Sequence, residues 1–151
     1  MAAPDPALVA LDSSVLVAGL SPWHEQFARA RPVLATLAAT TPADRRFVLP
    51  VPALVESYSV LTRLPAPLRV SPAKALSALH QVLHGRVQLV NLAAEETWEF
   101  LTLQRDSRVL GGRVYDALIL ACAAKAGAGI LLTFNVRHFA SLSSTVTIRE
   151  P

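Results

Sequence analysis

The sequence predicts an α/β protein with a central parallel sheet covered by helices on both faces. Short apolar runs of strand length alternate with longer segments of helical character along the whole chain. Each connection between successive strands is long enough to hold a helix, as parallel strands require. No internal repeat, low-complexity tract or linker interrupts this alternation. We therefore expect residues 1–151 to form a single domain.

The first expected strand covers residues 8–11 and ends at Asp12. Residues 13–20 can then form a helix. A serine followed by proline is typical of an N-cap with proline at the first helical position, so a further helix is expected over residues 21–37. Pro32 lies inside that segment and should kink or split the helix, because proline lacks a backbone N–H.

The middle of the chain repeats the alternation. Residues 46–50 form the second expected strand, and a proline opens a helix over residues 52–64. Glu56 falls in the first turn of that helix or just beyond it. A second Ser-Pro pair opens a helix over residues 71–85, with a glycine at its end. Residues 86–92 form the third strand.

Two helices precede the fourth strand. The first covers residues 94–106 and carries acidic residues in its N-terminal half, where the helix dipole favours them. The segment 117–124 is apolar or small throughout, which predicts a fully buried helix. Asp116 stands at the head of that helix, and Gly127 is placed to end it.

The C-terminal part supplies the last two strands. Residues 130–133 are a short apolar run and should form the fourth strand. We expect residues 134–139 to form a polar loop after it, and residues 145–149 to form an edge strand. The single cysteine, Cys122, has no partner for an internal disulfide and is expected to be a small core residue.

The composition indicates where the protein is expected in the cell and which kinds of partner suit it. The hydrophobic fraction is 52%, but no uncharged apolar run is long enough to span a bilayer. The N-terminus lacks the basic region and cleavage pattern of a signal peptide. We therefore expect a soluble, cytoplasmic protein without a membrane partner. The net charge of +3 suits an anionic partner such as nucleic acid, and a compositional bias towards Arg and Ala explains it equally well.

Several polar side chains are expected at the carboxyl edge of the predicted sheet, where such folds bind ligands. Asp12 follows the first strand, and Glu56 lies in the helix after the second. Asp116 heads the helix before the fourth strand, and Thr133 and Asn135 follow that strand. Clustered carboxylates stay ionised together only if a cation or a group of arginines holds them. A set of oxygen ligands alone suits Mg²⁺, with Mn²⁺ as the alternative.

Such a site fits phosphodiester hydrolysis, which needs an activated water, a stabilised dianion and a neutralised leaving group. On this hypothesis Asp12 and Asp116 ligate the metal most directly. Glu56 ligates it or orients the attacking water. Asn135 contributes a neutral carbonyl oxygen or a bound water.

Other side chains near this edge have two possible roles each. Ser14 and Thr133 can orient a carboxylate with their hydroxyls, and they can equally cap the local backbone. Arg113 can grip a phosphate, pair with a carboxylate or stay solvated. His138 can contact RNA or serve the local structure.

The same segments resemble the PIN-domain ribonucleases, and within them the VapC toxins of bacterial type II toxin–antitoxin systems. The matching segments are LDSSVLV around Asp12, PALVESYSVLTRL around Glu56, GGRVYDALILACAAKAG around Asp116, and LLTFNVRHF around Thr133 and Asn135. They follow the family's order and span nearly the whole chain. The resemblance implies a three-layer α/β/α fold, metal-dependent cleavage of RNA, a VapB-type antitoxin as partner, and a homodimer. Many PIN nucleases carry Asp where this chain has Asn135.

Three other functions remain open from the sequence. A hydrolase with Asp12 as an aspartyl-phosphate nucleophile would need a second carboxylate two residues on, where this chain has Ser14. A catalytically weakened PIN module that binds RNA or protein is favoured by Asn135 and opposed by the three intact acids. A PIN nuclease of RNA processing without a toxic role is the nearest rival.

Overall fold

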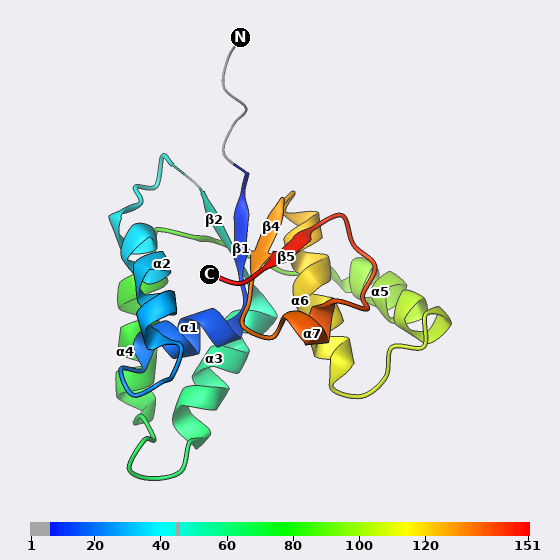
Figure 1. Ribbon diagram of the computed structural model, residues 1–151. Helices are drawn as coiled ribbons and strands as arrows, with labels where there is room; N and C mark the ends of the chain where they lie inside the picture. Colours follow the sequence, from blue (N-terminus) through cyan, green and yellow to red (C-terminus); the bar gives the residue numbers. More distant parts are fainter. Residues whose placement is uncertain (1–6, 45) are drawn as a thin grey trace.

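The computed structural model describes residues 7–44 and 46–151, and it contains one parallel sheet (Figure 1). The five strands lie in the order β3-β2-β1-β4-β5, and every neighbouring pair is parallel. The strands are β1 (Val9–Leu11), β2 (Phe47–Pro50), β3 (Gln88–Val90), β4 (Ile130–Leu132) and β5 (Thr147–Arg149). The predicted parallel sheet is therefore confirmed, with β5 at one edge as expected.

Helices flank this sheet on both sides. The helices are α1 (Ser13–Leu20), α2 (Phe27–Ala39), α3 (Val51–Arg63), α4 (Pro72–Leu83), α5 (Ala94–Asp106), α6 (Arg113–Lys125) and α7 (Val136–Phe139). In the view of Figure 1, α2 and α4 lie to the left of the sheet, α3 lies below the strands, and α5 and α6 lie to the right. Within the described residues, no helix combines the length and the apolar character that crossing a membrane requires.

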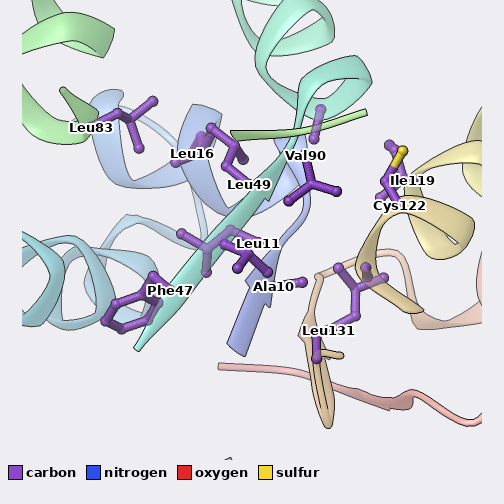
Figure 2. Packing of buried hydrophobic residues seen from close by; sticks show 14 of the residues in the cluster. Ala10, Leu11, Leu16, Phe47, Leu49, Leu83, Val90, Ile119, Cys122 and Leu131 are labelled. Atoms are coloured by element: carbon purple, nitrogen blue, oxygen red, sulfur yellow. The ribbon is translucent and has the colours of Figure 1, made fainter. Parts of the chain in front are cut away.

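The core lies around β1, the central strand. Ala10 and Leu11 of β1, Leu49 of β2 and Leu131 of β4 are all 0% exposed. Figure 2 shows these side chains together with Ile119 of α6. Near-continuous apolar strands are typical of parallel sheets that are covered on both faces. Each fully buried aliphatic side chain contributes about 1.5–3 kcal/mol to folding, so the carboxyl ends of β1 and β4 are held firmly.

Helix α6 ends as predicted but is not fully buried. Gly127 adopts φ 76°, and the Ala128 amide donates to the Ala123 carbonyl at 3.0 Å, which closes the last turn. Ala124 is exposed and Leu118 is partly exposed. The prediction of a fully buried helix was wrong because α6 belongs to an outer layer and presents only one face to the core.

The Ser-Pro pair at residues 21–22 does not open a helix. Ser21 ends α1 instead, and its amide donates to the Ala18 carbonyl at 3.3 Å. Helix α2 begins only at Phe27, so Pro32 is its sixth residue and leaves the helix unsplit. The Ser21 hydroxyl is buried and has no hydrogen-bond partner among the described residues. The same residue pair at Ser71 does cap a helix, since the Ser71 hydroxyl accepts from the Lys74 amide at 3.4 Å.

The predicted polar loop over residues 134–139 is also wrong in part. Residues 136–139 form the one-turn helix α7, and Phe139 within it is 1% exposed. Burial of that phenyl ring accounts for the turn, since the local sequence offers little helical periodicity. The third strand is shorter than the predicted 86–92, because only residues 88–90 pair with β2.

Cys122 is a core residue, as predicted. The side chain is 0% exposed, and burial raises the pKa of its thiol above the ordinary value. A buried neutral thiol is a small apolar group with little reactivity.

Gly19 gives the first testable prediction. A Cβ at this position would lie 2.3 Å from Leu34 Cδ1 and 2.7 Å from Leu34 Cγ, where α1 and α2 approach each other. Gly19→Ala should therefore lower the free energy of unfolding by about 1–3 kcal/mol through overpacking. Gly112→Ala is the matched control, because nothing lies within 4 Å of the Cβ that alanine would add there. Urea denaturation of both variants measures the difference, and equal stabilities would show that Leu34 moves aside freely.

Candidate active site

Asp12 is held rigidly where β1 passes into α1. It is the N-cap of α1 and is 2% exposed. Its Oδ2 accepts hydrogen bonds from the Ser14 hydroxyl at 2.6 Å and the Thr133 hydroxyl at 2.7 Å. The Ser14 amide lies 3.4 Å from the same oxygen. The carboxylate is therefore fixed by β1, α1 and the end of β4 together.

The two hydroxyls that hold Asp12 are themselves oriented by the backbone. The Phe134 amide donates to the Ser14 hydroxyl at 3.0 Å, and the Asn135 amide donates to the Thr133 hydroxyl at 2.9 Å. Each hydroxyl oxygen thus accepts a backbone N–H and turns its own hydrogen towards the carboxylate. Thr133 therefore has both of the roles that the sequence left open, since Asn135 is two residues away, whereas Ser14 orients the carboxylate and accepts its backbone N–H from the distant Phe134.

Ser13 is a site residue that the sequence analysis missed. Ser13 is 7% exposed, and its hydroxyl donates to Glu56 Oε2 at 2.6 Å. The Ser13 Oγ also lies 3.5 Å from Asp12 Oδ1. Ser13 therefore links the carboxylate of α3 to the one that follows β1. Nothing in the sequence distinguishes Ser13 from Ser14, since both are small hydroxyl residues directly after Asp12.

Asp116 faces the other two acids from the first turn of α6. Its side chain is 22% exposed, and His138 Nδ1 lies 3.8 Å from its Oδ2. Burial raises the pKa of the Asp116 carboxyl, and the charges of Asp12 and Glu56 raise it further. The nearby His138 and Arg113 act in the opposite direction. The three acids are thus close enough to influence one another's ionisation.

The donor set fits a hard divalent cation in charge and chemistry. Asp12 follows β1, Glu56 lies on α3 and Asp116 on α6, and the charges of the first two acids act on the half-buried Asp116. In the part of the chain that the structure describes, no group of three His, Cys, Asp or Glu side chains stands at metal-holding distances. Ser13 holds Glu56 and His138 neighbours Asp116 in this arrangement, so side-chain rotation would have to accompany binding of an ion.

The remaining predicted residues lie around this cluster. Asn135 is exposed, caps α7 without a side-chain hydrogen bond, and lines a hollow together with Ser13, Ser14 and Glu56. The exposed Arg113 donates from its guanidinium to the Ser141 hydroxyl. His138 is brought to Asp116 by α7.

Two hollows flank the acids. One lies between α3 and α6, has a volume of about 710 Å³, and has Glu56 and Asp116 in its wall. The other has a volume of about 340 Å³ and is lined by Glu56 and Asn135. Glu56 borders both, so an extended substrate laid across this carboxylate can occupy both hollows.

The raised pKa of Asp116 predicts a stability effect. A carboxyl whose pKa is raised in the folded state contributes stability below its ordinary value of 3.8, and this contribution is lost as the pH rises through the folded-state pKa. Asp116→Asn without metal should therefore raise the melting temperature at neutral pH, and the gain should disappear below about pH 4. Calorimetry in EDTA measures both.

Asp106→Asn is the control for this stability effect, because that acid is exposed at the end of α5 and pairs with its neighbour Arg105. It should leave the melting temperature nearly unchanged. An Asp116→Asn protein that melts below the wild type at neutral pH would mean that contacts such as the one with His138 outweigh the cost of burying the charge and the repulsion from the other acids.

A family model and two relatives match the sequence of this chain. A family model described as the PIN domain matches residues 9–143. Ribonuclease VapC40 of Mycobacterium tuberculosis is 35% identical over 130 residues, which cover 86% of this chain and 88% of that protein. Ribonuclease VapC27 of the same species is 37% identical over 83 residues, or 55% of this chain and 58% of that protein.

Solved structures share the fold. The structure of Mycobacterium tuberculosis VapC20, described as a sarcin–ricin loop cleaving toxin, matches with a TM-score of 0.63 at 21% identity and covers 92% of this chain and 98% of that one. VapBC2 from Rickettsia felis, bound to a DNA fragment from its promoter, matches with a TM-score of 0.61 at 18% identity and covers 95% and 98%. The three-layer α/β/α fold that the sequence predicts is confirmed.

Proposed function

This chain belongs to the PIN domain family and, within it, to the VapC ribonucleases, and on that premise we propose that it is a metal-dependent endoribonuclease and the toxin of a VapBC-type pair. The observation that supports the proposal is that the charges of Asp12, after β1, and Glu56, on α3, act on Asp116 in the first turn of α6. A cluster of this kind favours a cation and, through it, a phosphate.

Asp12 and Asp116 would hold the ion, Mg²⁺ or alternatively Mn²⁺, and Glu56 would complete the set or position water. A bound Mg²⁺ supplies charge stabilisation to the phosphoryl oxygens and makes a water more acidic. Asp12 suits a fixed ligand because Ser14 and Thr133 hold its Oδ2 in one orientation. Ligands held by hydrogen-bonded neighbours lose less freedom when they bind an ion.

The other residues act on water and on the substrate. Glu56 is exposed, so a water can reach its carboxylate while Ser13 fixes the direction of Oε2. Such a carboxylate can orient the attacking water and accept its proton. Arg113 and His138 are exposed cationic or potentially cationic groups beside Asp116 and are placed to contact a phosphate.

The direct test is a cleavage assay on total RNA with purified protein. Fragments should form with Mg²⁺ or Mn²⁺ and should be absent when EDTA is added. Intact RNA under all metal conditions, from a protein that is folded by circular dichroism, would contradict the proposed activity. Equal cleavage in EDTA would contradict only the metal dependence.

The partners follow from the same site. A VapB-type antitoxin can neutralise such an enzyme by inserting an Arg among the carboxylates and covering the adjoining groove, since a guanidinium is the side chain that binds carboxylates best. We also propose a homodimer, a cytoplasmic location and a single PIN domain over residues 1–151. The family model covers residues 9–143 of that range.

Because Asn135 is uncharged, we expect the free protein to bind metal weakly. Three carboxylates with one negative charge each, Asp12, Glu56 and Asp116, give the pocket a formal charge of −3 where a fourth acid would give −4. A unit charge at about 4 Å contributes about 4 kcal/mol at an effective dielectric constant of 20, before desolvation. Asn135→Asp should therefore tighten Mg²⁺ or Mn²⁺ binding roughly tenfold or more, as measured by calorimetric titration.

Asn135→Ala is the companion variant, and it should impair cleavage less than Asp116→Asn does. Equal metal affinities for the wild type and Asn135→Asp would place Asn135 outside the reach of the ion. That result would leave the three acids as the complete set of charged ligands.

A further inference from the structure

The larger of the two hollows beside the acids has features that metal binding does not use. This hollow, the α3–α6 pocket, has a volume of about 710 Å³ and is bordered by Tyr115, Val55, Arg63 and Asn91 in addition to Glu56 and Asp116. Arg63 and Val55 come from α3, Tyr115 comes from α6, and Asn91 follows β3. The pocket therefore extends the carboxyl edge of the sheet from the acids towards β3.

Its apolar side chains are open to solvent. Tyr115 is 67% exposed and Val55 is 62% exposed, and they belong to opposite walls of the pocket. Tyr115 directly precedes Asp116 on α6. An exposed aromatic ring beside a set of carboxylates marks a place where a flat, partly apolar group can bind next to the reacting phosphate.

We propose that the α3–α6 pocket binds the base of a nucleotide next to the scissile phosphate of single-stranded RNA, with the base stacked on Tyr115. This inference rests on the proposed function. A phosphate held by the acids lies at the wall of the pocket, because Glu56 and Asp116 line it. The base of the same or the adjoining nucleotide then has this hollow within its reach, and proteins commonly stack unpaired RNA bases on aromatic side chains.

The polar residues of the pocket suit the rest of such a nucleotide. Arg63, in the last turn of α3, supplies a guanidinium for a flanking phosphate or for a base edge. Asn91 is exposed and carries both a donor and an acceptor, which is what reading a base edge requires. Bases in an RNA duplex are not accessible to side chains in this way, so the substrate segment must be unpaired.

The two hollows differ in size, and this favours one position for the stacked base. The hollow near Asn135 is about half as large, at about 340 Å³, and it shares Glu56 with the α3–α6 pocket. A strand that crosses Glu56 would place a base in the larger hollow and continue along the smaller one. A protein segment in the pocket is the alternative, and the position of the acids in its wall favours the RNA.

The test measures RNA affinity separately from cleavage. Labelled single-stranded RNA is titrated, with fluorescence anisotropy as the readout, against Asp12→Asn proteins that also carry a pocket substitution. Tyr115→Ala should weaken binding about tenfold, because the base loses the aromatic ring on which it stacks. Tyr115→Phe should keep most of the affinity. Trp98→Ala is the matched control, since Trp98 is 69% exposed on α5 and does not line the pocket.

A second measurement tests the assignment of Asn91. Sequencing of the fragments released by the otherwise unchanged protein should show that Asn91→Ala relaxes the base preference at one position beside the cleavage site. Unchanged preference at every position would overturn the role of Asn91.

The outcomes separate this inference from the proposed function. Equal RNA affinity for Tyr115→Ala and its parent, in a protein that binds and cleaves RNA, overturns the pocket and leaves the enzyme. Loss of antitoxin binding with RNA affinity unchanged assigns the pocket to a protein partner and also overturns the inference. Absence of RNA binding and cleavage by the wild type refutes the proposed function, and the pocket assignment with it.

Discussion

Asp12→Asn and Asp116→Asn should each reduce metal-dependent RNA cleavage by on the order of 10³-fold or more. Charge stabilisation by a bound metal is worth several kcal/mol in the transition state, and each 1.36 kcal/mol corresponds to a factor of ten in rate. An amide at either position removes a negative ligand from the site. The rate of fragment formation on a defined RNA, at saturating Mg²⁺, measures the loss.

Two further variants make this result specific. Asp106→Asn removes an exposed carboxylate of α5 that pairs with Arg105, and it should cleave at the wild-type rate. The cleavage rate of Ser13→Ala should be about 10–100-fold below the wild-type rate. This substitution removes the hydrogen bond that orients Glu56 but removes no charge. Wild-type rates for both Asp12→Asn and Asp116→Asn, in folded proteins, would refute the proposed site.

Production of the wild-type protein alone should arrest bacterial growth, and production of Asp12→Asn should not. An active endoribonuclease damages the RNA of the cell that makes it, so the effect should follow the activity of the site. Co-production of a cognate VapB-type antitoxin should restore growth, since the carboxylates attract an inserted Arg. Colony counts after induction measure both effects.

The same experiment distinguishes the toxin from its nearest rival. Harmless production of a folded protein that cleaves RNA would favour a PIN nuclease of RNA processing. Arrest by Asp12→Asn as strong as that by the wild type would show that the growth effect does not depend on cleavage. The Asp106→Asn protein, matched in charge to Asp12→Asn, should be as toxic as the wild type.

The local sequence was sufficient to predict the bounds of a helix where the segment contains its own capping residues. Helix α5 has the predicted bounds, Ala94–Asp106, because Glu96 accepts from the Ala93 amide at 2.6 Å and fixes the start of the helix. The Ser-Pro signal at residues 21–22 was insufficient. Ser21 is already the C-cap of α1, and the tertiary contact of α1 with α2 delays the next helix to Phe27.

The sequence alone determined the order of the five strands and of every helix except α7, and it predicted Asp12, Glu56 and Asp116 as the acids at one edge of a parallel sheet. Periodicity and residue chemistry are local properties, so the sequence displays them directly. Which hydroxyl holds which acid was decided by tertiary structure. Thr133 reaches Asp12 across a separation of 121 residues, and Ser13 reaches Glu56 across 43. The pairing of β1 with β4 and the position of α3 beside α1 create these contacts. Local sequence patterns do not show which residues far apart in the chain come into contact.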